Sequence, residues 1–116
     1  IGDEALYAFV YPNFMLNRYG PILDTNWVVP LGHDRTRVIF DFYFRDTEGP
    51  QAKEFIERSI AASQRVQEED VAICESVQKG LGSPAYDRGI YAPEVEMAAY
   101  HFHRLLADDL RGGVPA

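Results

Sequence analysis

The stretch TRVIFDFYFR, residues 36–45, decides the fold. Aromatic and β-branched side chains recur at every second position, which is the period of a β-strand, and one apolar face is shared by Val38, Phe40, Phe42 and Phe44. Upstream, similar runs at 6–11, 14–19 and 26–30 are separated by turn residues. Strands that follow one another through short turns predict an antiparallel meander over residues 5–45.

After residue 45 the apolar spacing changes to three or four residues, the period of a helix. Capping oxygens in Asp46-Thr47-Glu48 and a first-turn proline at Pro50 predict a long helix over residues 50–79, which ends at Gly80 and Gly82. Its predicted inward stripe comprises Ile56, Ile60, Ser63, Val66, Asp70, Ile73, Cys74 and Val77.

A second helix is predicted over residues 93–111, opening at Pro93, with Ala98, Ala99, Phe102, Leu105, Leu106 and Leu110 turned inward. Strands followed by two helices predict an α+β fold, in which the helices pack on one face of an antiparallel sheet.

Size and charge narrow the function. The chain has 116 residues, 47% of them hydrophobic, so it forms one small domain at most. It begins at Ile1 and leads straight into a strand-like run, from which we expect a segment of a longer protein.

A net charge of −7 argues against a nucleic-acid partner, and no run reaches the roughly 18 apolar residues of a membrane span. A single cysteine, Cys74, excludes an intrachain disulfide, and we expect it to be an inert core thiol.

Asp70 is the unusual residue of the long helix, because its position on the apolar stripe predicts a buried carboxylate. An unpaired buried carboxylate costs several kcal/mol or takes up a proton, so it requires compensation. One interpretation is a buried salt bridge to Arg18 or Arg37 of the sheet, or a hydrogen bond to backbone. The other is a metal ligand or a catalytic acid or base.

Other candidate groups are weaker. His101 and His103 lie about 200° apart on a helix, so they are poorly placed to chelate one ion. Aromatic side chains of the sheet are core residues by default, but in a cavity they would suit a quaternary ammonium group through cation–π attraction. Phosphate loops, Ser-His-Asp spacing and nucleotide fingerprints are absent from the sequence.

Several motifs occur in an order that resembles one known family. They are NRYGP at 17–21, DTN at 24–26, EDVAICESVQKGLGS at 69–83 and HFHRLL at 101–106. Together they resemble the C-terminal part of the catalytic domain of Rieske-type non-haem iron oxygenase α subunits, most closely the members that act on choline, betaines and carnitine. The resemblance implies a helix-grip, START-like partial domain over residues 1–116.

The resemblance also implies cofactors and a reaction. In that family two histidines and one aspartate hold a mononuclear Fe(II), and Asp70 matches the aspartate. A [2Fe–2S] Rieske cluster in a preceding domain, supplied by a ferredoxin or reductase, would deliver electrons for hydroxylation with O₂. The implied substrate is a quaternary ammonium compound, with choline converted to betaine aldehyde, and the implied assembly is a homotrimer in the cytoplasm or the chloroplast stroma.

Further residues follow from the same resemblance. Tyr7, Tyr11, Phe14 and Trp27 are candidates for the substrate pocket, and Glu75 and Gln78 for the surroundings of the iron or an electron-transfer interface. The chain departs from the family in lacking the Rieske motif and the upstream histidine pair, so alone it should neither hold iron firmly nor turn over. Two alternatives stay open: demethylation of glycine betaine or carnitine, and a non-catalytic helix-grip module that binds a small apolar ligand.

Overall fold

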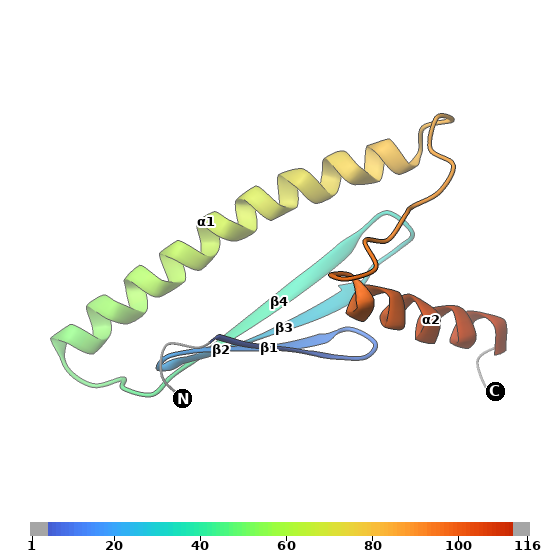
Figure 1. The fold of residues 1–116 in the computed structure, drawn as a ribbon. Helices are drawn as coiled ribbons and strands as arrows, with labels where there is room; N and C mark the ends of the chain where they lie inside the picture. The colour runs from blue at the N-terminus through green and yellow to red at the C-terminus, as the bar shows by residue number, and fades with distance from the viewer. Residues whose placement is uncertain (1–4, 113–116) are drawn as a thin grey trace.

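A four-stranded antiparallel sheet followed by two helices makes up the fold (Figure 1). The computed structural model describes residues 5–112. The strands are neighbours in chain order, and the elements are β1 (Ala5–Val10), β2 (Phe14–Tyr19), β3 (Ile22–Pro30), β4 (Thr36–Phe44), α1 (Pro50–Leu81) and α2 (Met97–Gly112). The predicted meander and α+β class are therefore confirmed.

The turn between β2 and β3 lies at the turn residues predicted from the sequence. Gly20 and Pro21 join β2 to β3, and Gly20 has a φ of 55°, a conformation that glycine adopts without steric penalty. The strand expected at 26–30 begins earlier, at Ile22, because Ile22 pairs with Tyr19 and Asp24 with Asn17. The prediction missed this start because Asp and Asn are uncommon in strands, and here cross-strand contacts override that preference.

Pairing between the strands assigns each side chain to a face of the sheet. Directly paired residues of antiparallel strands share a face. The Phe44 face therefore continues through Ile22 and Tyr19 to β1, where Tyr7 and Phe9 lie on it. Phe44 meets Phe55 of α1 edge-on, with ring centroids 6.1 Å apart, and Phe9 meets Phe102 of α2 at 5.2 Å. Both helices therefore contact this face, which we call the helix-facing side.

The helix ends differ in part from prediction. α1 begins at Pro50 as expected, but its N-cap is Gly49, with a φ of 87°, and no side chain caps it. The capping predicted from Asp46-Thr47-Glu48 is therefore wrong. α2 begins at Met97 rather than near Pro93, because the Glu96 carboxylate accepts a hydrogen bond from the Ala92 amide at 2.6 Å and residues 93–95 form a turn.

Burial is shallow over the described residues. Ile22 is their one buried hydrophobic residue, whereas Asp24, Thr25 and Asn26 beside it are the buried polar ones. In α2 only Phe102, Leu105 and Ala107 are half-buried, so the inward positions predicted for its remaining apolar residues are wrong. α2 contacts the chain near the β1–β2 turn, where Phe102 touches Phe9 and Tyr11 and Asp109 accepts a hydrogen bond from the Tyr11 hydroxyl (Figure 1).

Candidate functional site

Asp70 lies on the row of α1 that points toward the sheet. The half-buried residues of α1 mark that row, and they are Ala52, Ile56, Ser59, Ser63 and Gln67. Asp70 follows Ala52 by about five helical turns of 3.6 residues, so it lies on the same line of the helix. Cys74 follows one turn later. The helical period thus directs the Asp70 carboxylate toward the helix-facing side of the sheet.

The predicted burial of Asp70 is wrong for this chain, because its side chain is exposed. Only the first half of α1 is partly covered by the sheet, and the second half exposes its apolar stripe, including 62% of Ile73. Cys74 is likewise exposed, contrary to the expected core thiol. Within residues 5–112, no layer of the fold covers this half of the helix.

The predicted salt bridge to Asp70 is also wrong. Arg18 pairs with Leu23 and Arg37 with Val29, which places both arginines on the face of the sheet away from the helices. None of the ion pairs found among the described residues includes Asp70. Its charge is therefore solvated and available to a ligand on this part of the chain.

Residues 5–112 do not form a complete metal site. They contain no group of three His, Cys, Asp or Glu side chains that could hold one ion. His101 and His103 belong to α2, and His103 Nδ1 is hydrogen-bonded to the Tyr91 hydroxyl. If an iron ion is held by two histidines and one aspartate, as the resemblance implies, these residues supply at most one of its three ligands, and that ligand would be Asp70.

The four predicted pocket residues do not come together. Tyr7 lies on the helix-facing side. Tyr11, just beyond β1, contacts Phe102 in a tilted arrangement, with ring centroids 5.8 Å apart, and donates a hydrogen bond to Asp109. Phe14 and Trp27 pair with each other and lie on the opposite face. The alternation of side chains across a strand thus separates Tyr7 from Phe14 and Trp27, and the predicted roles of the four residues in a substrate pocket stay predictions.

Glu75 and Gln78 lie in the exposed second half of α1, one and two turns beyond Asp70. The hydrogen bonds and ion pairs found among the described residues do not include either side chain. Their predicted roles near the iron or at an interface stay predictions.

Among the described residues, the buried carboxylate is Asp24, which the sequence pattern did not indicate. It is 4% exposed and lies on the helix-facing side of β3. Asn17 Nδ2 donates to Asp24 Oδ1 at 2.7 Å, Asn26 Nδ2 donates to the same oxygen at 3.1 Å, and the Tyr19 hydroxyl donates to Oδ2. The available signal was the alternation of Asp24 and Asn26 within the DTN motif, opposite Asn17 across the turn.

Burial and the Asp24 carboxylate both raise the pKa of the Tyr19 hydroxyl. Burial raises the pKa of Tyr19 well above its usual value, and the hydrogen bond to Asp24 and the Asp24 charge raise it further. The hydroxyl therefore stays protonated and remains a donor. We call Asn17, Tyr19, Asp24 and Asn26 the Asp24 network.

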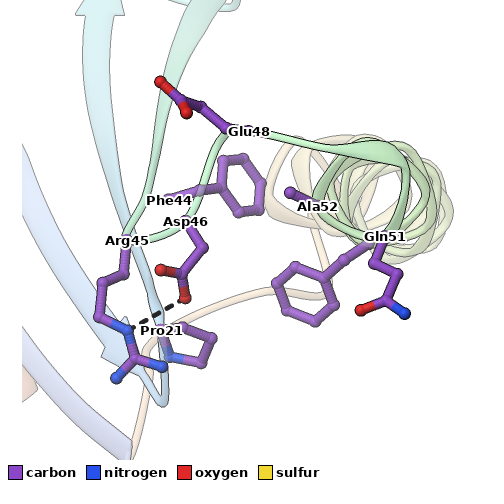
Figure 2. A pocket seen from close by; sticks show the side chains of 8 residues that line it. Pro21, Phe44, Arg45, Asp46, Glu48, Gln51 and Ala52 are labelled. Atoms are coloured by element: carbon purple, nitrogen blue, oxygen red, sulfur yellow. Dashed lines mark hydrogen bonds and ion pairs between the residues drawn. The ribbon is translucent and has the colours of Figure 1, made fainter.

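Two pockets lie outside this region. Figure 2 shows one of about 380 Å³ between the start of α1 and the end of β4, and it is lined by Pro21, Phe44, Arg45, Asp46, Glu48, Gln51, Ala52 and Phe55. The second, of about 270 Å³, is lined by Tyr91, Pro93, Glu96, Met97 and Tyr100. Neither includes Asp70 or the Asp24 network, so neither is assigned to the candidate site.

Comparisons with known proteins give a family model and several relatives that match most of the chain. The model of the ring hydroxylating alpha subunit (catalytic domain) matches residues 2–112. The chain is 58% identical over 111 residues to the chloroplastic choline monooxygenase of Arabidopsis thaliana and 42% identical over 111 residues to that of Spinacia oleracea. It is 29% identical over 103 residues to the putrescine 2-hydroxylase of Ralstonia nicotianae.

These matches cover 96% of this chain but 26% and 25% of the two choline monooxygenases, and 85% of this chain but 28% of the putrescine 2-hydroxylase. The chain thus spans about a quarter of the length of the curated relatives it matches. No solved structure is a significant match. Neither helix among residues 5–112 is long and apolar enough to cross a membrane.

Proposed function

This chain belongs to the ring hydroxylating alpha subunit family, and we propose that it forms the C-terminal part of the catalytic domain of a Rieske-type oxygenase. The long α1 on one face of an antiparallel sheet supports a helix-grip arrangement that residues outside this chain complete. The exposed apolar stripe of α1 supports the same view, because such a surface requires a cover.

The reaction that we propose is hydroxylation of a quaternary ammonium compound, with choline as the first candidate and betaine aldehyde as the product. Similarity to choline monooxygenases from several plants supports this substrate class. A mononuclear iron, bound in the intact subunit, would supply oxygen activation with electrons from a [2Fe–2S] cluster. The electron donor would be a ferredoxin or reductase, and the assembly a homotrimer.

Asp70 carries the proposal on this chain. It is a carboxylate on the sheet-facing row of α1, it is accessible, and it lies on a helix whose first half is anchored on the sheet. A carboxylate is one of the three protein ligands of the two-histidine-one-carboxylate iron site. The two histidines would come from residues outside this chain, and Glu75 and Gln78 would lie in the surroundings of the iron or at a subunit interface.

The choline monooxygenases that the chain resembles are chloroplastic, so we propose the plastid stroma as the compartment if the protein comes from a plant or alga, and the cytoplasm otherwise.

Iron content decides the role of Asp70. The full-length protein and its Asp70→Ala variant are purified anaerobically, and iron is measured chemically and by EPR. We expect the variant to lose the mononuclear iron and to keep the Rieske signal. Glu69→Ala is the matched control, because Glu69 is an exposed carboxylate next to Asp70 but about 100° around the helix. Unchanged iron in Asp70→Ala, or no iron in the parent protein, would sink the proposal.

Product analysis decides the substrate. The full-length protein is supplied with O₂, an electron donor and, in separate reactions, choline, glycine betaine or carnitine. Betaine aldehyde from choline supports the proposed reaction, whereas formaldehyde from glycine betaine or carnitine assigns a demethylase. Binding of an apolar ligand with no product from any substrate would favour the non-catalytic module.

A further inference from the structure

The Asp24 network holds the buried carboxylate of the described sheet, and neither iron binding by Asp70 nor oxygen activation requires it. Its three donors, Asn17, Asn26 and Tyr19, are all uncharged. Among the ion pairs of the described residues, none includes Asp24, and Arg18 and Arg37 lie on the other face of the sheet. The network therefore holds a net negative charge away from solvent.

The three hydrogen bonds use both oxygens of the carboxylate, because Asn17 and Asn26 donate to Oδ1 and Tyr19 donates to Oδ2. They satisfy its acceptors, but they bring no positive charge to balance it. A buried charge without an opposite charge is unfavourable by several kcal/mol unless something compensates it. Asp24 is thus suited to a site that a cation occupies.

Aromatic rings surround the network on the same face. In the register of the sheet, Tyr7 lies opposite Asn17, Phe42 opposite Asp24 and Phe40 opposite Asn26. The rings of Phe40 and Phe42 are nearly parallel, with centroids 6.3 Å apart and an interplanar angle of 15°. A carboxylate with aromatic faces beside it is the combination that attracts quaternary ammonium groups.

The position fits the proposed reaction centre. α1 contacts the helix-facing side through Phe55, and Asp70 lies on the row of α1 that points toward this side. In the intact subunit we expect Asp70 on the helix and the Asp24 network on the sheet to line the same substrate pocket.

We propose that the Asp24 network, with Tyr7, Phe40 and Phe42, is the cation-recognising wall of the substrate pocket, and this inference rests on the proposed function. The aromatic faces contact the quaternary ammonium group. Asp24 is covered by its three donors, so it acts through its charge rather than by contact, which is effective over several ångströms in a site of low dielectric. It is a specificity-determining residue and does not take part in bond breaking.

The test compares a cation with its neutral isostere. Full-length protein binds choline and 3,3-dimethylbutan-1-ol, in which carbon replaces the charged nitrogen, and calorimetry gives both dissociation constants. In Asp24→Asn we expect choline to bind at least tenfold more weakly and the neutral alcohol to change less than twofold, with KM for choline raised and kcat retained. Asp41→Asn is the matched control, because Asp41 is an exposed carboxylate on the opposite face.

Two further variants guard against a failure to fold. Asn17→Asp combined with Asp24→Asn moves the charge to the paired strand, and we expect it to recover most of the preference for choline. If Asp24→Asn does not fold, Phe42→Leu carries the test, with an expected loss of choline binding of at least fivefold and unchanged binding of the alcohol. Equal weakening of both ligands by Phe42→Leu would contradict the proposal.

The two hypotheses fail in different ways. A parent protein that does not prefer choline to 3,3-dimethylbutan-1-ol overturns the proposed substrate class. A parent protein that prefers choline, with the same preference in Asp24→Asn, overturns this inference alone. In that case the charge of Asp24 is compensated by a cation from the remainder of the subunit.

Discussion

Asp24 lies on the helix-facing side of the sheet, and Asp70 lies on the row of α1 that points toward that side, but the first carboxylate is buried and the second is exposed. Asp24 is the third residue of β3, between the paired strands β2 and β4, and it accepts three hydrogen bonds. Asp70 lies in the half of α1 that no described residue covers, and it is exposed. The comparison teaches that a position within an apolar pattern fixes the direction of a side chain, whereas burial requires a second layer at that point.

The largest effect is expected from Asp70→Asn, which separates function from stability. Turnover by the full-length protein should fall at least about 100-fold, because loss of a ligand weakens the iron site. The free energy of unfolding of the iron-free protein should change by less than about 0.5 kcal/mol, since no hydrogen bond or ion pair found among the described residues includes the Asp70 side chain. Oxygen consumption and urea unfolding measure the two quantities. A large loss of stability without iron would mean that Asp70 is structural.

Asp24→Ala, unlike Asp70→Asn, should lower the stability of the iron-free protein. It removes the acceptor of three donors, and unsatisfied buried donors make the folded state less stable by about 2 to 3 kcal/mol in total. Urea unfolding of the iron-free full-length protein measures this loss, with Asp41→Ala as the exposed control. A change equal to that of the control would contradict the role of Asp24 in holding β2 and β3 together.

Phe102→Ala tests how α2 is attached, at a smaller magnitude. Phe102 lies with its ring centroid 5.2 Å from that of Phe9 and 5.8 Å from that of Tyr11, but it is only half-buried. We therefore expect the free energy of unfolding, measured with urea, to decrease by about 1 to 2 kcal/mol. Leu110→Ala, at a highly exposed position of the same helix, is the control. Equal proteolysis of α2 in both variants would show that the aromatic contact does not fix the helix.

The smallest effect concerns pH and Tyr19. Its pKa is raised in the fold, so the folded protein keeps the proton at pH values where tyrosine of the unfolded chain ionises, above about 10. Stability contributed by Tyr19 is complete below pH 10 and decreases as the pH rises above it. Tyr19→Phe should therefore flatten the decline between about pH 10 and 11. Tyr43→Phe, an exposed tyrosine of the opposite face, should leave the decline unchanged.

Much of the fold could be predicted from the sequence because its signals are local. Alternation from Val38 to Phe44 predicted β4, Gly20-Pro21 predicted a turn, and Pro50 predicted the start of α1. The start of β3 was missed because Asp24 and Asn26 oppose strand formation locally, and only pairing with β2 places them in the sheet.

The candidate site was predictable only in part. Helical periodicity placed Asp70 on the row that faces the sheet, and the resemblance to a family suggested its chemistry. Its exposure was not predictable, because it depends on where α1 leaves the sheet. The separation of Tyr7 from Phe14 and Trp27 depends on register, which a pattern of aromatic residues does not contain.

By itself, the sequence determined the order and type of the elements, the membership of the family and the side of α1 on which Asp70 lies. These follow from the local periods of helix and strand and from motifs along the chain. Only the tertiary structure decided that Asp24 is the buried carboxylate and that Phe40, Phe42 and Tyr7 surround it. The reason is physical: burial and charge compensation depend on groups that are distant in sequence and meet when the strands pair.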